Sequence, residues 1–166
     1  MIRASIRSVS SAERIVHKAV ACVVRDSGGR RELLVFDHPS AGTQVPKGTM
    51  EDGEDVVAAA LRELHEESGI TSAVPVAVVG TWLRRIGAGP REDGPGEAHL
   101  WHVVLLRPTA ELPDAWSHVA HGSPEEDGLV FAYRWLTVDE GIAAGLHPLF
   151  AEVARMVAAS VEGAGE

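Results

Sequence analysis

The alternation of apolar and polar positions along the chain predicts strands on both sides of one central helix. Residues 19–24 form a short apolar run that is typical of a buried strand, and residues 32–36 form a second one. Ser27-Gly28-Gly29 between them is a turn signal, so these two strands are expected to form a hairpin. Three further strand-like runs follow, at residues 76–86, 99–106 and 129–136.

Residues 54–68 have the spacing of an amphipathic helix. Its apolar side chains recur at helical intervals and define one buried stripe, formed by Val57, Ala60, Leu61 and Leu64. Glu54 and Asp55 are expected in the first turn, where the helix dipole favours negative charge. Gly69 fits the left-handed position that ends many helices, so we expect the helix to stop there.

The remaining segments are predicted to be loops and two further helices. Residues 38–53 are rich in Gly, Pro, Asp and Thr and are predicted to be a loop, and residues 87–96 are predicted to be a hairpin tip. Thr137 and Glu140 have capping-box spacing for a short helix. A final helix is expected over residues 148–161, and it would bury Leu149, Phe150, Val153 and Val157.

This order of elements predicts an α/β (α+β) fold in which helices cover the faces of one mixed sheet. The chain has 166 residues and no visible linker or internal repeat, so we expect one domain over residues 1–166. About residues 1–14 are expected to form a flexible tail. Residues 107–128 form a long connection, which is typical of lids and binding loops.

The net charge indicates which partners to expect, and the single cysteine bears on the cellular compartment. Acidic residues outnumber basic ones by 24 to 15, and a protein that binds a nucleic-acid duplex usually carries a basic face, so no such partner is expected. Cys22 cannot form an internal disulfide and is predicted to be a buried apolar residue. No apolar stretch is long enough to cross a membrane, and a cytoplasmic protein is expected.

Three carboxylates gather near the end of the predicted central helix. At about 100° per residue, Glu63, Glu66 and Glu67 fall within roughly one 100° arc beside the apolar stripe. The negative end of the helix dipole disfavours acidic side chains there, and the nearby Arg62 offsets only part of the repulsion. A hard divalent cation such as Mg²⁺ would neutralise them, since Mg²⁺ prefers oxygen ligands. A solvated acidic helix end is the alternative that the helix alone leaves open.

The segment from Gly48 to Ile70 carries a more specific signal. It follows the pattern G-x5-E-x7-R-E-U-x-E-E-x-G-U, where U is an aliphatic residue, and every specified position matches. This segment resembles the Nudix box, a signal far more specific than a lone glycine pattern. The resemblance implies a Nudix-like α/β/α sandwich, with the mixed sheet between helices, over essentially the whole chain.

The resemblance also implies roles for the residues of the box. Glu63 and Glu67 would be the principal ligands of Mg²⁺ or, as an alternative metal, Mn²⁺, and Glu66 would be a third carboxylate of the cluster. The backbone carbonyl of Gly48 would be a further ligand. Two supporting residues would hold these ligands in place, Arg62 by charge-assisted hydrogen bonds and Glu54 by pairing with Arg62.

The activity implied by the resemblance is hydrolysis of a diphosphate linkage in a nucleoside diphosphate derivative or a nucleoside triphosphate. Metal-activated water would attack phosphorus, and a carboxylate would accept its proton. Besides the box glutamates, we select Glu126 from the acidic run 125–127 as this base, although that run also fits an ordinary charged turn. The alternative function is a Nudix-fold sensor that binds a nucleotide without turnover.

The substrate-binding residues are less constrained by the sequence. Lys47 is placed next to the box and is expected to contact a phosphate, and Trp82 and Arg84 are expected to line a pocket by stacking and phosphate pairing. On the 107–128 connection, Trp116, His118 and His121 are further candidates for substrate contact, with a structural role as the alternative. No subfamily signature is found past the box, so the small nucleotide-like substrate is left open. A homodimer is also left open, since dimers are common among Nudix proteins.

Overall fold

A mixed β-sheet forms the centre of the protein. The structure is a computed structural model, and it describes residues 13–86 and 96–163. In these residues the strands are β1 Arg14–Ser27, β2 Arg30–His38, β3 Gly42–Gln44, β4 Lys47–Thr49, β5 Ala73–Ile86, β6 Glu97–Pro108, β7 Trp116–Val119 and β8 Val130–Thr137. The helices are α1 Val56–Ser68 and α2 Ala151–Glu162, with short 3-10 helices η1 Ile142–Gly145 and η2 Pro148–Phe150.

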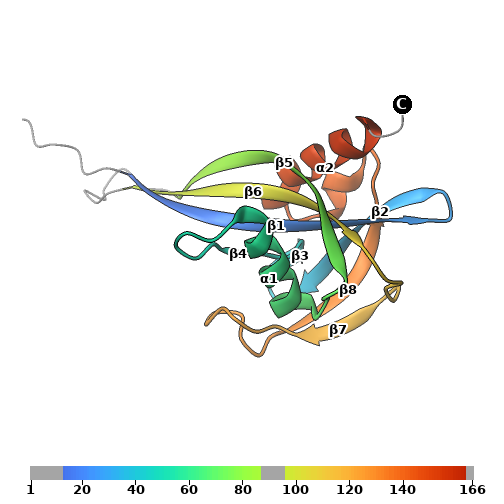
Figure 1. Cartoon of the computed structure of the whole chain (residues 1–166), viewed down its shortest axis with the longest axis horizontal. Helices are drawn as coiled ribbons and strands as arrows, with labels where there is room; N and C mark the ends of the chain where they lie inside the picture. The colour runs from blue at the N-terminus through green and yellow to red at the C-terminus, as the bar shows by residue number, and fades with distance from the viewer. Residues whose placement is uncertain (1–12, 87–95, 164–166) are drawn as a thin grey trace, which may run out of the picture.

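The long strand β1 joins two parts of this sheet. The main strand order is β5-β6-β1-β2-β8-β7, with β3 paired to β2 and β4 paired to β1 (Figure 1). β1 pairs in parallel with β6, whereas its pairings with β2 and β4 are antiparallel. Because β4 pairs with the first half of β1 and β2 with its last residues, a different strand lies beside β1 in each half.

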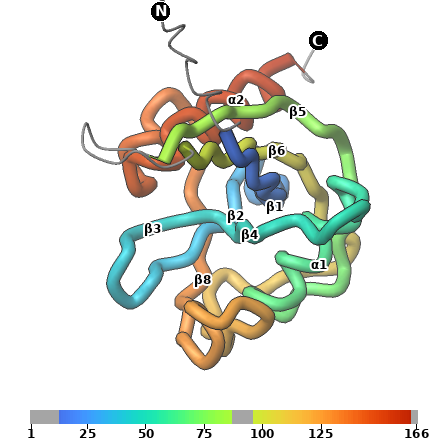
Figure 2. The backbone as a smooth tube through the Cα atoms, turned by 90° about the vertical axis from the view of Figure 1, so that its left-hand side faces the viewer, coloured from blue at the N-terminus to red at the C-terminus, as the bar shows by residue number. Residues whose placement is uncertain are grey.

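Two helices cover opposite faces of the sheet, as the apolar pattern predicts. α1 closes one core that contains Ala60, Leu64 and Val104, and α2 closes a second core that contains Val103, Val153 and Val157. In Figure 2, α2 lies above β1 and β6, and α1 lies below them. Val103 and Val104 are neighbours on β6 that face the two different cores, which is the alternation expected of a strand covered on both sides. The mixed sheet between helices is confirmed.

The central helix begins two residues later than the sequence suggests. α1 starts at Val56, so Glu54 and Asp55 do not lie in the first turn, where they were expected. The capping geometry explains this difference. The Asp55 carboxylate accepts hydrogen bonds from the backbone N–H groups of Val57 and Ala58. These are among the N–H groups that have no partner inside a helix, so Asp55 is the N-cap. At the other end Gly69 has φ 78° and ends the helix, as predicted.

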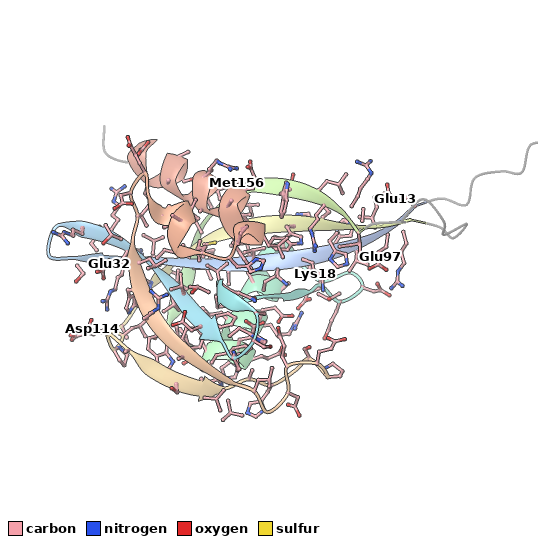
Figure 3. The ribbon with its side chains drawn as sticks, turned by 180° about the vertical axis from the view of Figure 1, so that it is seen from behind. Glu13, Lys18, Glu32, Glu97, Asp114 and Met156 are labelled. Carbon is pink, nitrogen blue, oxygen red and sulfur yellow. The ribbon has the colours of Figure 1, made fainter. Side chains whose placement is uncertain are left out.

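Both of the segments predicted as long loops contain strands. Residues 38–53 include β3 and β4, and residues 107–128 include β7. Arg25 holds the beginning of the second segment in place, because its guanidinium donates to the Leu112 carbonyl at 3.3 Å and to Asp114 at 2.8 Å. The same guanidinium bonds Glu32 at 2.9 Å, and Figure 3 shows Glu32 and Asp114 at the same end of the molecule. The beginning of the 107–128 connection is therefore tied to the sheet, and the connection contains a strand, so it is not a structureless loop over its whole length.

The C-terminal elements follow the predicted order with shifted starts. Thr137 is the last residue of β8, so the capping box expected from Thr137 and Glu140 is wrong. The short helix η1 has no side-chain cap, and the Asp139 carboxylate accepts from the Gly141 N–H in the turn before it. Phe150, Val153 and Val157 are buried as expected, and so is Cys22, whereas Leu149, which lies in η2 before α2, is only half-buried. The 87–95 part of the predicted hairpin tip and residues 1–12 of the predicted tail lie outside the described residues, while Arg14 already belongs to β1. None of the described helices has the length and apolar character that a membrane span requires.

Candidate active site

Helix α1 carries two acidic side chains into its buried face. Glu63 is 6% exposed and Glu67 is 2% exposed, because both lie on the same side of the helix as Ala60 and Leu64. Carboxylates are rarely buried so completely without a partner. Burial raises the pKa of Glu67 well above its usual value, and the negative charges of Glu126 and Glu63 raise it further. Burial also raises the pKa of Glu63, although the Arg62 guanidinium opposes this effect.

Arg62 joins the loop before α1 to the carboxylates on the helix. Its guanidinium forms two hydrogen bonds with Glu54, at 2.8 and 2.9 Å, and one with Glu63 at 2.8 Å. It also contacts Glu66 at 3.3 Å and donates to the carbonyl oxygen of Thr49 at 3.0 Å. This fork lowers the pKa of Glu54 to about 2. The pairing of Arg62 with Glu54 that the Nudix resemblance implies is present in the structure.

The short strand β4 brings its backbone against the buried carboxylates. A side chain at Gly48 would have its Cβ only 1.9 Å from the Glu63 carboxyl carbon, so only glycine leaves room for that carboxylate. One residue earlier, the backbone N–H of Lys47 donates to Glu67 at 3.4 Å. β4 is fixed in this position because it pairs with β1 through Lys18, Ala19 and Val20. The backbone of Gly48 and the carboxylates of Glu63 and Glu67 are thus neighbours.

The turn between β7 and β8 closes the site from the other part of the sheet. The backbone N–H of His121 donates to the Glu66 carbonyl at 3.1 Å, and a Cβ at Gly122 would lie 2.1 Å from the Glu66 carboxylate. The following residues reach Glu126, which lines a cavity of about 310 Å³ together with Gly48, Glu63 and Lys47. Glu126 therefore lies beside the box carboxylates, as its selection from the sequence requires.

Two lysines supply positive charge around the same cavity. Lys47 and Lys18 both line it, and Lys18 donates to the Thr49 hydroxyl (Figure 3 labels Lys18 on β1). Burial lowers the pKa of Lys47, and Lys18 lowers it further, while the nearby Glu67 acts in the opposite direction. The Lys47 ammonium lies 5.0 Å from the centre of the Trp101 ring, a distance that permits a cation–π interaction.

Trp82 and Arg84 lie further from the carboxylates than Lys47. Trp82 packs edge-on against Trp101 at 5.2 Å between ring centres, so one indole ring separates it from Lys47. Arg84 pairs across the strands with His99 and does not line the cavity that holds Glu63 and Glu126. The structure therefore does not bring Arg84 together with the box residues, and it brings Trp82 only to the second layer of side chains around Lys47.

The aromatic and histidine candidates on the 107–128 connection contact residues outside the carboxylate cluster. Trp116 stacks on Tyr133 with 4.9 Å between ring centres, and its indole N–H donates to the Ser68 carbonyl at 3.1 Å. The His118 ring lies against Gly69, and His121 bonds Asp127 at 3.3 Å. None of these three candidates lines the 310 Å³ cavity, so the structure does not bring them together with Glu63 and Glu126 there.

Three residues that lie near the site were not predicted from the sequence, namely Lys18, Trp101 and Tyr133. The buried hydroxyl of Tyr133 lies near Glu67 and Glu126. Lys18 had a usable signal, because it is a charged residue that directly precedes the apolar run 19–24 of a strand. Trp101 and Tyr133 lie within apolar strands and carry no such signal.

The carboxylates of the site are not yet arranged as a complete set of metal ligands, but their chemistry suits a magnesium ion. Among residues 13–86 and 96–163, no three acidic, cysteine or histidine side chains already converge at metal-ligand spacing. Mg²⁺ does not need such a cage, because proteins usually bind it through one or two carboxylates and leave several waters on the ion. Glu63 and Glu67, which are buried beside the side-chain-free Gly48, provide carboxylates of that kind. The residues present therefore fit Mg²⁺ or Mn²⁺.

Comparisons with known proteins agree with this geometry. Residues 16–158 match the NUDIX domain family. Nudix hydrolase 25 of Arabidopsis thaliana is 29% identical over 127 residues, which cover 68% of this chain and 69% of that protein. An RNA pyrophosphohydrolase of Agrobacterium fabrum is 36% identical over 64 residues, which cover 35% of this chain and 38% of that protein.

A solved structure gives the same result for the fold. A C. elegans Ap4A hydrolase superposes with a TM-score of 0.57 at 20% sequence identity, and the match covers 89% of this chain and 98% of the other. At this identity the likeness concerns the fold alone. The family match extends from β1 into α2 and thus includes every element that forms the cavity. The chain therefore belongs to the NUDIX family of hydrolases.

Proposed function

We propose that this protein hydrolyses a diphosphate linkage in a nucleoside diphosphate derivative or a nucleoside triphosphate, and that it requires Mg²⁺. One observation carries the proposal, namely that two buried carboxylates of α1, Glu63 and Glu67, lie near the half-buried Glu126 of the β7–β8 turn. Glu63 and Glu126 line one cavity, and Glu67 is close enough to both that their negative charges raise its pKa. Arg62 bonds Glu63, and the nearby Lys47 opposes part of the negative charge around Glu67, so the cluster still favours binding of a cation.

Glu63, Glu67 and the Gly48 carbonyl are the residues that would hold the ion, with Glu66 as the third carboxylate of the cluster. When bound, Mg²⁺ would supply charge neutralisation on the phosphoryl oxygens and a lower pKa for an attacking water. Glu54 and Arg62 would keep the carboxylates oriented, through the hydrogen bonds between 2.8 and 2.9 Å that join them to each other and to Glu63.

Glu126 is the proposed proton acceptor. It lies on the cavity wall with Glu63, and it is close enough to Glu67 to raise the pKa of that carboxylate. A carboxylate on a turn, outside the helix that holds the ion, would be free to take a proton from the attacking water as its oxygen bonds to phosphorus and the bond from phosphorus to the leaving oxygen breaks. The ammonium groups of Lys47 and Lys18 would bind phosphate oxygens on the same cavity.

The space around the carboxylates supports a substrate larger than inorganic pyrophosphate. A second cavity of about 430 Å³ is lined by residues 14–17 and 49–54. It shares Thr49 and Glu51 with the 310 Å³ cavity, so the two adjoin. A nucleoside or a similar group could occupy the second cavity while its phosphates lie in the first. Because the relatives include an RNA pyrophosphohydrolase and an Ap4A hydrolase, 5′-triphosphate RNA and dinucleoside polyphosphates belong in any substrate test.

The experiment is a substrate panel with product identification by ³¹P NMR, with Mg²⁺ and with EDTA. The panel contains nucleoside triphosphates, nucleoside diphosphate derivatives such as ADP-ribose, dinucleoside polyphosphates and 5′-triphosphate RNA. For the substrate that is cut, we expect Glu126→Gln to lower kcat by roughly 10²–10⁴-fold. Glu67→Gln should remove the dependence on Mg²⁺ together with most of the activity.

Glu140→Gln is the matched control, because Glu140 is exposed and does not line the cavity. It should behave as the wild type. Full activity of Glu67→Gln would contradict the metal assignment, and full activity of Glu126→Gln would contradict only the choice of base. Tight binding of one nucleotide without turnover of any compound would instead support a nucleotide sensor.

A further inference from the structure

The hydroxyl group of Tyr133 is a buried donor that has no hydrogen-bond partner in the part of the chain that the structure describes. Tyr133 is 2% exposed and lies on β8, in the core cluster that also contains Ala60 and Leu64 of α1. Buried hydroxyl groups almost always have a partner, because leaving one without an acceptor destabilises the fold. This position therefore needs an explanation other than stability.

Neighbouring aromatic rings fix the orientation of Tyr133. Trp116 stacks on it at 4.9 Å with an interplanar angle of 11°, and Phe36 packs against it at 5.4 Å. The Trp116 indole in turn donates to the carbonyl of Ser68, the last residue of α1. The phenol ring is thus held against the end of the helix that carries the site glutamates, and it cannot turn its hydroxyl toward solvent.

The hydroxyl lies near the buried carboxylates of the site. Leu64 packs in the same cluster as Tyr133, and Glu67 follows Leu64 by three residues on the same face of α1. Burial raises the pKa of Tyr133, and the negative charges of Glu67 and Glu126 raise it further. The phenol therefore keeps its proton and is available as a donor.

Glu67 has the capacity to accept a hydrogen bond from this donor. Among the described residues, the Glu67 carboxylate accepts one hydrogen bond, from the Lys47 backbone N–H at 3.4 Å. That distance is long for an N–H···O bond, and an ionised carboxylate offers about four acceptor positions. An unused donor and a poorly satisfied acceptor are thus buried in the same region.

We propose that Tyr133 is a positioning residue, whose hydroxyl donates a hydrogen bond to the Glu67 carboxylate when that carboxylate binds the metal ion. The inference rests on the proposed function, because it takes Glu67 as a metal ligand. Metal ligands usually receive such a bond from a neighbouring group, which fixes their orientation. The phenol hydroxyl would then have a hydrogen-bond partner only in the metal-bound protein.

The single tyrosine of the chain makes the proposal directly observable. Protein labelled with ¹³C at the tyrosine Cζ should show one resonance, and the Cζ shift responds to hydrogen bonding of the phenol. We expect this resonance to move when the full-length protein is saturated with Mg²⁺. Metal binding is measured in parallel by isothermal titration calorimetry, and Mn²⁺ affinity by electron paramagnetic resonance.

Tyr133→Phe tests the hydroxyl while it keeps the ring and its stacking. We expect Mn²⁺ affinity and kcat to fall by about 10–100-fold, with little change in KM. The melting temperature in EDTA should not fall, because the deleted group has no partner there. Ser160→Ala is the matched control, since it removes a hydroxyl that bonds the Met156 carbonyl on α2, far from the glutamates.

The outcomes separate this inference from the proposed function. A protein that binds no divalent metal refutes both. A protein that binds metal, but whose tyrosine resonance stays fixed and whose Tyr133→Phe variant keeps wild-type metal affinity, refutes only the positioning role. A large fall in melting temperature for Tyr133→Phe in EDTA would also overturn it, because the hydroxyl would then already have a structural partner.

Discussion

Glu67 combines almost complete burial with few polar partners. Its carboxylate is 2% exposed and accepts one long hydrogen bond from Lys47 among the described residues. Its neighbours Glu63 and Glu126 carry the same charge, so the ionised form is disfavoured twice. Without a cation, this residue must lower the stability of the fold.

Glu67→Gln should therefore stabilise the metal-free protein at neutral and alkaline pH. The folded pKa of Glu67 lies above its unfolded value, so the wild type keeps its stability at acidic pH and loses part of it as the pH rises through the folded pKa. Glutamine does not titrate and avoids this loss. We expect a gain of about 1–3 kcal/mol at pH 8 and almost none at pH 4. Thermal melts in EDTA should show it, at roughly 2–4 °C per kcal/mol for a protein of this size.

Added Mg²⁺ should make the wild type more stable than the Glu67→Gln variant, which reverses their order of stability in EDTA. Ligand binding stabilises only a protein that has the site, so the wild type should gain stability with metal concentration and the variant should not. Glu140→Gln, at an exposed position, serves as the control for loss of one charge. An unchanged melting temperature for Glu67→Gln across the whole pH range in EDTA would mean that burial of this carboxylate has no energetic cost.

At the scale of elements, the position of α1 depends on its capping residue. Asp55 accepts from two backbone N–H groups at 3.0 and 3.1 Å, and it thereby fixes where the first turn begins. Glu54 then falls in the preceding loop, where its carboxylate accepts from Arg62 and from the Glu51 backbone. A shift of the helix start would separate Glu54 from Arg62, and the orientation of Glu63 depends on that arginine.

Asp55→Ala should lower the free energy of unfolding by about 1 kcal/mol, the usual loss for an N-cap. Urea or thermal unfolding measures this change, and the matched control is Asp52→Ala, at an exposed aspartate that precedes the N-cap of α1 by three residues. The Asp52 variant should unfold like the wild type. Equal losses for both variants would show that general charge near the helix, rather than the cap, stabilises this end of α1.

The length of each element decides whether the sequence pattern is sufficient to predict it. The central helix was predictable because the 13 residues of α1 give a clear period, and the predicted runs 19–24 and 76–86 fall inside the 14-residue strands β1 and β5. β3 and β4 have three residues each and β7 has four, which is too few for a period to emerge among Gly, Pro and Asp. The Nudix box identified Glu63 and Glu67 without these strands. The Gly48 backbone could be located beside them only once β4 was seen to pair with β1.

At the scale of the whole molecule, the site joins segments that are far apart in sequence. Glu63 and Glu67 belong to α1, whereas Glu126 follows β7, which lies at the opposite edge of the sheet from β5 (Figure 1). No local pattern predicts this meeting, because it depends on the pairing of β7 with β8 and of β8 with β2. The close approach of Gly122 to Glu66 fixes the distance between the two segments.

Gly122→Ala should therefore disturb the relation between the turn and the helix. The new Cβ would lie 2.1 Å from the Glu66 carboxylate, and the residue has φ 96°, which side chains other than glycine rarely adopt. One partner must move, and a displacement near 1 Å at catalytic groups can lower kcat on the order of 10- to 100-fold. The measurement is kcat with the substrate found in the panel, together with the melting temperature.

Gly128→Ala, in the same turn, separates the effect of backbone strain from the effect of the contact with Glu66. Gly128 also has a positive φ, 85°, but its Cβ would meet no atom within 4 Å. This control should lose about 1–3 kcal/mol of stability from backbone strain and keep a kcat near the wild-type value. If both variants lose kcat equally, strain in the turn accounts for the effect. If only Gly122→Ala loses kcat, the contact between Gly122 and Glu66 sets the position of Glu126 relative to α1, and the active site is a property of the complete sheet rather than of the Nudix box alone.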